Sequence, residues 1–128
     1  MLELYFDGYC LTNPGTIGGY GVVIKKNNKI IKTISNHFTE IVSNNIVEYR
    51  GLNAGLTWLL DNDFEDEDIE VYGDSLLVIN QMKGWWRIKK GIYKQMALVT
   101  KKLLGNFKNL TFTWIPREKN EEAHNLSQ

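Results

Sequence analysis

Two kinds of apolar periodicity alternate along this chain, and their order constrains the fold more than any other feature. Alternating apolar residues predict a strand over residues 2–7, and further strand-like runs predict strands over residues 20–26, 29–38, 68–73 and 110–115. Apolar residues at helical spacing predict helices over about 45–61, from Ser75, over 93–104 and from near Asn120. A hairpin followed by strands that alternate with helices predicts an α/β fold with a mixed five-stranded sheet flanked by helices.

The length of 128 residues suits one compact core, and we predict a single domain over residues 1–128. No apolar stretch approaches the roughly 20 residues that cross a bilayer, and no signal-peptide pattern opens the chain. The single Cys10 excludes an internal disulfide and fits a reducing compartment. These features predict a cytoplasmic protein with no membrane partner.

The formal net charge of zero conceals an uneven distribution. Seven of the 15 acidic residues fall between Asp61 and Glu70, where no basic residue occurs. We expect this run to be a solvated connection between a helix and a strand, because it has no core periodicity. The rest of the chain then carries eight acids against 15 bases, and such an excess of positive charge attracts polyanions such as nucleic acids.

Three carboxylates occupy positions where burial is expected. Asp7 closes the strand-like run L-E-L-Y-F-D, Asp74 closes I-E-V-Y-G-D, and Glu48 precedes Leu52 by four residues on the apolar face of a predicted helix. An unpaired buried carboxylate is costly, whereas Mg²⁺ prefers oxygen ligands. Sites in such sheets gather at the carboxyl ends of strands. We therefore expect the three side chains to meet around a divalent metal and to support phosphate chemistry.

Each acid also has a purely structural interpretation. Asp7 precedes Gly8 and could be a turn residue. Glu48 could complete a capping box with Asn45, three residues earlier, and Asp74 could be the N-cap of the helix that follows.

Four motifs resemble the type 1 ribonuclease H family, in order and at suitable spacing over essentially the whole chain. They are Y-F-D-G…N-P-G…G-G-Y-G, S-N-N-I-V-E-Y-R-G-L, Y-G-D-S-L-L-V-I-N-Q and W-I-P-R-E-K-N-E-E-A-H-N-L-S. The resemblance implies the ribonuclease H fold and a monomeric endonuclease that cuts the RNA strand of RNA–DNA hybrids, leaving 5′-phosphate and 3′-hydroxyl ends. It implies two Mg²⁺ or Mn²⁺ ions, held by Asp7, Glu48 and Asp74, with Asp7 shared between both ions.

The same resemblance implies a set of residues that bind the hybrid. Its 2′-hydroxyl groups and phosphates would be contacted by Asn13, Gly15, Ser43, Asn44, Asn45 and Asn80, with Arg117 as a further phosphate contact. Trp86, beside Trp85 in a basic Gly-flanked loop, matches the aromatic position that packs on the DNA strand, whereas Trp58 and Trp114 are expected in the core. The asparagines could also serve as local caps and turn residues.

The sequence departs from the family pattern at three places. His124 stands in N-E-E-A-H where the fourth metal-site aspartate is usual, and imidazole suits Mn²⁺ better than Mg²⁺. We include His124 among the catalytic candidates, because an imidazole can orient water or carry a proton. The chain is too short for a long basic protrusion, and the link before the last helix, P-R-E-K, contains no histidine.

Two alternative functions remain open from the sequence. One is a binding module that holds the hybrid without efficient cleavage, because His124 replaces the acid. The other is a DNA-cutting nuclease of the same superfamily, although N-P-G and S-N-N favour a hybrid substrate.

Overall fold

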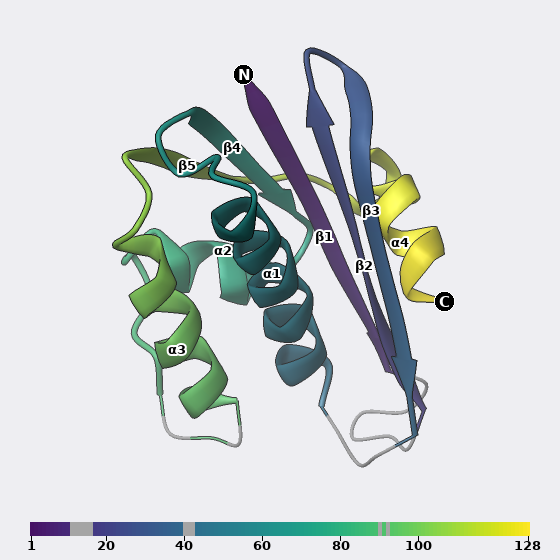
Figure 1. Cartoon of the computed structure of the whole chain (residues 1–128). Coiled ribbons are helices and arrows are strands. Elements are labelled where there is room, and N and C mark those ends of the chain that lie inside the picture. The colour runs from purple at the N-terminus through teal and green to yellow at the C-terminus, as the bar shows by residue number, and fades with distance from the viewer. Residues whose placement is uncertain (11–16, 40–42, 90, 92) are drawn as a thin grey trace.

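The computed structural model describes residues 1–10, 17–39, 43–89, 91 and 93–128. These residues form five strands, four α-helices and one 3-10 turn (Figure 1). In chain order they are β1 (Leu2–Cys10), β2 (Gly18–Lys26), β3 (Lys29–Phe38), α1 (Asn44–Asp61), β4 (Asp68–Gly73), α2 (Leu76–Met82), α3 (Lys94–Leu104), β5 (Asn109–Trp114), η1 (Arg117–Lys119) and α4 (Glu121–Ser127).

The strands form one mixed sheet in the order β3-β2-β1-β4-β5. The pairs β1–β2 and β2–β3 are antiparallel, whereas β1–β4 and β4–β5 are parallel. This confirms the predicted five-stranded mixed sheet and places β1 at its centre. Asn27 and Asn28 both have positive φ and close the β2–β3 hairpin, as asparagine does in tight turns.

The first strand is longer than predicted. The alternation of apolar residues indicated residues 2–7, but β1 continues to Cys10 because β2 pairs with it as far as Cys10↔Gly18. Its pairing with β4 ends earlier, at Phe6↔Gly73. Asp7 therefore lies within a strand and beyond the last β1–β4 pair, which excludes a turn role for it.

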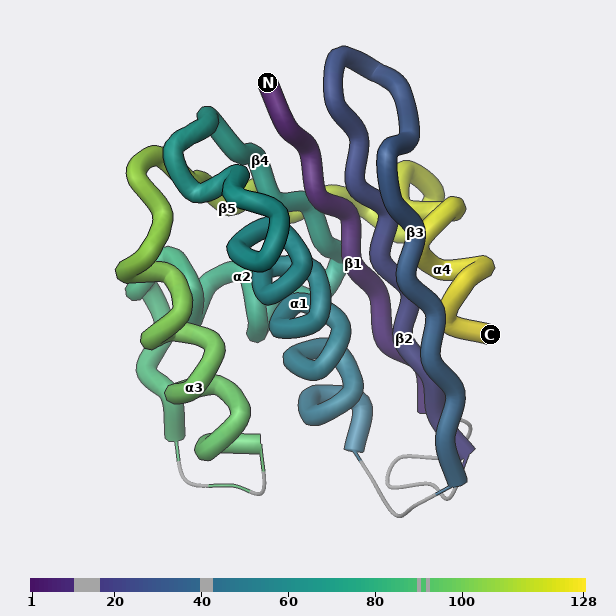
Figure 2. Tube along the Cα trace, in the orientation of Figure 1, coloured from purple at the N-terminus to yellow at the C-terminus, as the bar shows by residue number. Residues whose placement is uncertain are grey.

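Helices cover both faces of the sheet. The traces in Figures 1 and 2 show α1, α2 and α3 on one face and α4 on the other. The last helix contacts β1, β2 and β3. None of the helices in the described part of the chain is both long and apolar enough to cross a membrane.

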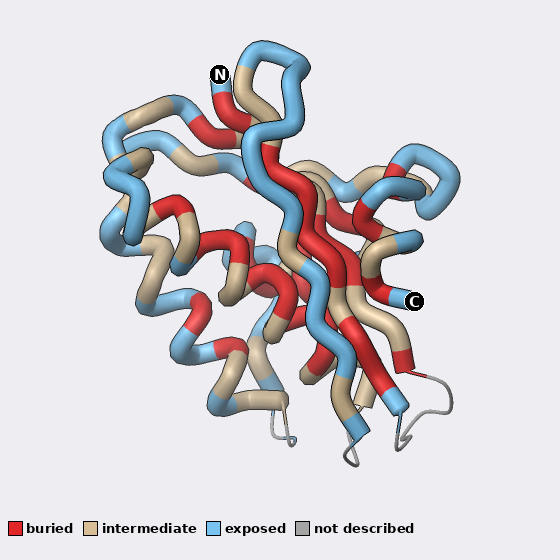
Figure 3. Tube along the Cα trace, turned by 45° about the vertical axis from the view of Figure 1, so that its right-hand side comes forward, coloured by how far each residue is buried: buried red, intermediate tan, exposed pale blue. Residues whose placement is uncertain are grey.

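The core lies between the sheet and α1. Buried segments concentrate on β1, β2 and the inner side of α1 (Figure 3). Its fully buried side chains include Leu4, Phe6, Leu52 and Leu56. Each such side chain stabilises the fold by about 1.5–3 kcal/mol relative to exposure, so this layer fixes the helix on the sheet.

Trp58 and Trp114, which the sequence places in the core, differ in how far they are buried. Trp58 is partly buried against the core and stacks on Phe64 at 5.8 Å between ring centroids. Trp114 is 42% exposed, so a core role for it is wrong. It is the last residue of β5, the edge strand of the sheet.

The backbone of α4 lies directly on a glycine of β2. A Cβ added at Gly21 would lie 2.3 Å from the carbonyl oxygen of Ala123 and 2.5 Å from Cβ of Leu126. Only a residue without a side chain lets the helix approach this closely.

We predict that Gly21→Ala lowers the free energy of unfolding by about 1–3 kcal/mol, because α4 must shift away from β2. Gly105→Ala is the matched control. Its φ is −62°, and the nearest atom to an added Cβ is 3.5 Å away. Urea unfolding measures both, and equal stabilities of the two variants would contradict the packing described here.

Candidate metal centre

Asp7 and Asp74 are brought together by the register of two parallel strands. The last β1–β4 pair is Phe6↔Gly73, and each aspartate is the next residue of its chain segment. Asp7 is 2% exposed and Asp74 is half-buried. The site therefore forms where the β1–β4 pairing stops, although Asp7 does not end its strand as the sequence suggested.

Glu48 enters the site from the second turn of α1. The helix is capped by Ser43, whose Oγ accepts a hydrogen bond from the Ile46 amide at 3.4 Å. Glu48 is consequently directed at β1, where Gly8 leaves room: a Cβ at Gly8 would lie 2.6 Å from the Glu48 nitrogen. A capping box between Asn45 and Glu48 is wrong, because the N-cap is Ser43.

Asp74 is likewise not a helix cap. The N-cap of α2 is Ser75, whose Oγ accepts from the Val78 amide at 3.2 Å. The local structural interpretations of all three acids are therefore wrong, and their proximity still requires an explanation.

Oxygen atoms of Asp7, Glu48 and Asp74 all lie within 4.8 Å of one another. Burial and the neighbouring Asp7 raise the pKa of Glu48 well above its ordinary value. Burial and Asp7 also raise the pKa of Asp74 to about 6, against the opposing effect of Arg117. The Oε2 atom of Glu48 is buried and has no hydrogen-bond partner among the described residues. A cluster of hard oxygen donors that repel one another fits a divalent cation such as Mg²⁺ or Mn²⁺.

His124 reaches the cluster from α4 on the other face of the sheet. Its Nδ1 lies 2.8 Å from Oδ2 of Asp7, and its side chain is 23% exposed. The three-acid group that is close enough for shared ligation does not include it. The structure thus places His124 in contact with one predicted metal ligand.

Two residues that the sequence analysis missed hold α4 beside Asp7. Asn120 donates from Nδ2 to the Phe6 carbonyl at 2.9 Å and is 2% exposed. The hydroxyl of Ser127 donates to the His124 carbonyl at 2.6 Å and lies 3.4 Å from Oδ2 of Asp7. No local pattern marks the contacts of Asn120 with Phe6 and of Ser127 with Asp7, which join residues more than 110 positions apart.

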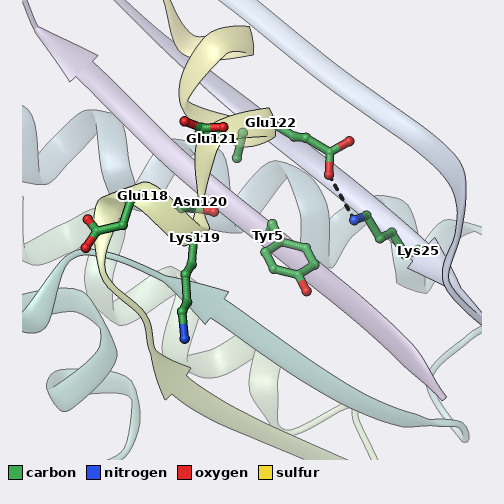
Figure 4. Close-up of a pocket in the computed structure, with 8 residues that line it drawn as sticks. Tyr5, Lys25, Glu118, Lys119, Asn120, Glu121 and Glu122 are labelled. Carbon is green, nitrogen blue, oxygen red and sulfur yellow. Dashed lines mark ion pairs between the residues drawn. The ribbon is translucent and has the colours of Figure 1, made fainter.

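The start of α4 is fixed on the same side of the sheet. Asn120 and Tyr5 of β1 both line a small cavity (Figure 4). The volume of this cavity is about 220 Å³. On its rim, Lys25 and Glu122 form an ion pair at 2.9 Å. Together with Asn120, this pair ties α4 to β1 and β2.

A cleft of about 570 Å³ contains the three acids. Asn44, Asn45 and Arg117 line it, so the structure brings these predicted substrate-binding residues to the metal site. Trp114 also lines the cleft and donates from Nε1 to the Asp74 carbonyl at 3.1 Å. The wrong assignment of Trp114 to the core hid this contact.

Other predicted substrate-binding residues lie outside this cleft. Asn80 is half-buried on α2, and its carbonyl accepts from the Trp85 and Trp86 amides. Ser43 caps α1. Asn13 and Gly15 fall outside the described residues.

Trp86 is 46% exposed and lines a separate pocket with Arg87 and Lys89. The buried Gln81 positions this loop, since its Nε2 donates to the Arg87 carbonyl at 3.1 Å and its Oε1 accepts from the Tyr49 hydroxyl.

We predict that Asp74→Asn stabilises the metal-free protein at pH 7. A carboxyl whose folded pKa is raised from 3.8 to about 6 reduces stability increasingly as the pH rises through that interval. Removing the charge should raise the free energy of unfolding by about 1 kcal/mol after allowance for solvent screening, or about 4 °C in Tm. The gain should shrink as the pH falls from 7 to 5.

The same variant should lose the increase in Tm that Mn²⁺ gives the unmodified protein, because binding to the folded state is what stabilises it. Thermal unfolding with and without Mn²⁺ measures both effects. Lower stability of Asp74→Asn without metal at pH 7 would contradict the charge repulsion described here.

Comparison with known proteins places this site in a family. Residues 5–128 match the family model described as Reverse transcriptase-like. The chain is 31% identical over 121 residues to the bifunctional protein Rv2228c of Mycobacterium tuberculosis, covering 94% of this chain and 33% of that protein. It is 32% identical over 126 residues to ribonuclease HI of Halobacterium salinarum, covering 98% of this chain and 62% of that protein. The chain thus spans about a third of the mycobacterial relatives it matches.

Solved structures agree with these matches. The ribonuclease H1 of Halobacterium salinarum superimposes with a TM-score of 0.88 at 31% identity, over 98% of this chain and 93% of that one. LC11-RNase H1, solved in complex with an RNA/DNA hybrid, gives a TM-score of 0.89 at 30% identity, over 99% and 94%. The family match, the sheet order and these relatives show that the chain belongs to the Reverse transcriptase-like family, as a ribonuclease H-like domain related to the type 1 ribonucleases H.

Proposed function

We propose that this protein is a metal-dependent endonuclease that hydrolyses the RNA strand of RNA–DNA hybrids. The observation that carries the proposal is the cluster of Asp7, Glu48 and Asp74 within 4.8 Å, including a buried carboxylate oxygen without a partner. Similarity to the ribonuclease HI of Halobacterium salinarum supports the reaction class, and the hybrid bound by LC11-RNase H1 supports the choice of substrate. We treat residues 1–128 as one domain that acts as a monomer.

The three carboxylates would hold two Mg²⁺ or Mn²⁺ ions, with Asp7 on the central strand shared between them. When bound, the ions supply activation of a water molecule and stabilisation of the leaving 3′ oxygen, giving 5′-phosphate and 3′-hydroxyl ends. Protons compete with metal for Glu48 and Asp74, because burial and crowding raise the pKa of both carboxyls. The protein's own contribution is to hold these oxygens close together despite their repulsion.

Residues that line the metal cleft would position the RNA strand. Asn44 and Asn45 offer amide donors and acceptors of the kind that read 2′-hydroxyl groups. Arg117, on the same cleft, would contact the phosphate next to the bond that is cut. Ser43 retains a hydroxyl proton while it caps α1, so it can also donate to a phosphate. We assign Asn13, Gly15 and Asn80 to the same strand from the family motifs.

The DNA strand would pass over the loop after α2. Trp86 is exposed there beside Arg87 and Lys89, a combination of ring and cations that suits sugar and phosphate. Gln81 holds the loop to α1 through Tyr49.

A second candidate function follows from His124. Because its Nδ1 lies 2.8 Å from Asp7 Oδ2, the imidazole occupies one oxygen of a carboxylate that metal must reach, and it stands where the family motif has an acid. Weak binding of the second ion would leave a module that binds the hybrid and cleaves it slowly. We favour retained cleavage with a preference for Mn²⁺, since imidazole binds Mn²⁺ better than Mg²⁺.

We predict internal cuts in the RNA strand of an end-labelled hybrid, with a higher rate in Mn²⁺ than in Mg²⁺. Asp7→Asn should lower the rate by about two orders of magnitude or more, because a shared metal ligand is lost. His124→Asp should raise the Mg²⁺-dependent rate about tenfold by restoring a carboxylate.

Asp61→Asn, which removes an exposed acid at the end of α1, is the matched control and should leave the rate unchanged. Hybrid binding measured alongside identifies the second candidate: measurable affinity without cleavage in either ion would replace the proposed enzyme with the binding module. Cleavage of duplex DNA alone would instead indicate a DNA nuclease.

We predict that Trp86→Ala weakens hybrid binding by about 1 kcal/mol, roughly fivefold in Kd, through loss of aromatic contact with the DNA strand. Its effect should fall on KM with little change in kcat, because the residue lies outside the metal cleft. Trp85→Ala removes the neighbouring ring and should leave hybrid affinity unchanged. Fluorescence anisotropy measures both, and equal losses in the two variants would argue against the specific role of Trp86.

A further inference from the structure

The edge strand β5 presents backbone groups that pair with no other strand in the described part of the chain. It has one neighbour in the sheet, β4. The Ile115 amide donates to the Gly73 carbonyl at 2.9 Å, and in a parallel ladder alternate residues bond the neighbouring strand. Thr111 and Thr113 therefore face β4 with their backbone groups, whereas Leu110 and Phe112 direct their amide and carbonyl groups to the free edge.

An apolar groove of about 510 Å³ lies beside this edge. It is formed by β5, the end of α3 with its following loop, and the turn after α2. Its apolar lining consists of Met82, Trp85, Leu104, Phe107, Leu110 and Phe112. Trp85 is 72% exposed, the largest value among the large hydrophobic residues that the structure describes. Exposed aromatic surface beside an unpaired strand edge is typical of interaction sites.

The charges of the groove are all positive. Lys83 and Lys108 line it, and no carboxylate does among the described residues. The Lys83 Nζ lies 4.2 Å from the centre of the Trp85 ring, which holds the ammonium group at the groove. A ligand that combines apolar side chains with carboxylates therefore complements this surface.

We propose that β5 and this groove bind an extended segment of a partner protein, which adds to the sheet as a sixth strand. Two apolar side chains at alternate positions would enter the groove, and acidic residues flanking them would meet Lys83 and Lys108. Peptide backbone supplies the alternating donors and acceptors that the groups of Leu110 and Phe112 require. A nucleic acid offers no such alternation of backbone donors and acceptors.

The proposed docking groove and the metal cleft share no lining residue. A bound segment on β5 would therefore leave the three carboxylates accessible, while the groove shares Trp85 with the pocket of Trp86 over which the DNA strand is proposed to pass. Binding of the segment to β5 and the groove would recruit the domain to the partner protein.

The probes are fluorescein-labelled six-residue peptides of the pattern acid–apolar–Thr–apolar–Thr–acid, with Asp at both ends and Leu, Ile, Phe or Trp at the apolar positions. We expect saturable binding in fluorescence anisotropy. Exchanging both acids of the probe for lysine should weaken binding about tenfold or more, as should the double variant Lys83→Glu/Lys108→Glu, since two ion pairs become repulsive. The double variant Lys29→Glu/Lys32→Glu on the opposite edge strand, β3, is the matched control and should bind unchanged.

Amide hydrogen exchange of the full chain locates the contact. Peptide should slow exchange at Leu110 and Phe112, with no added protection at Thr111, whose amide already faces β4. Failure of every probe in the series to bind, or protection at other strands only, would overturn the proposal. So would a hybrid duplex, in place of the peptide, protecting these amides and losing affinity in the Lys83→Glu/Lys108→Glu variant, which would make the surface a nucleic-acid contact.

Discussion

Mutual repulsion among three crowded carboxylates is the constraint on which the rest of this structure depends. Asp7 and Asp74 follow the last β1–β4 pair, and Glu48 is directed at them from α1. The raised pKa values of Glu48 and Asp74 show that the metal-free arrangement disfavours full ionisation. The buried core under α1 must supply the free energy that keeps them together. Binding of a cation between the three carboxylates would relieve this repulsion.

The helix on the opposite face of the sheet, α4, also contributes to the site. The glycine at position 21 lets α4 lie on β2, and Asn120 fixes its start to the Phe6 carbonyl. These contacts position the imidazole of His124 against Oδ2 of Asp7. The central aspartate thus has acidic neighbours on one side and an imidazole on the other. Compared with an aspartate, a histidine at position 124 carries a different charge, and it restricts access to Oδ2 of Asp7.

Much of this arrangement could be predicted from the sequence, because it depends on local patterns. Strand-like runs located β3 and β4 with their observed bounds, and apolar spacing located α1 to within one residue of its start. The meeting of the three acids followed from the rule that strand ends share an edge of the sheet. The extra length of β1 could not be predicted, since its residues beyond Asp7 are held by pairing with β2 and lack apolar alternation.

Contacts between distant segments could also not be predicted from the sequence. Whether Trp114 is buried depends on which strand forms the edge of the sheet, and Ser127 approaches Asp7 only because α4 packs on glycine. Both are properties of packing between elements, which periodicity within an element does not encode.

Calorimetric titration of the metal-free protein with Mn²⁺ at pH 6, in two buffers of different ionisation enthalpy, tests the central claim most directly. If the crowded carboxylates receive the ion, binding must displace protons held by Glu48 and Asp74, so the measured heat will differ between the buffers. The Asp7→Asn variant should not bind. Binding with the same heat in both buffers, or unchanged binding to the variant, would contradict this account of the site.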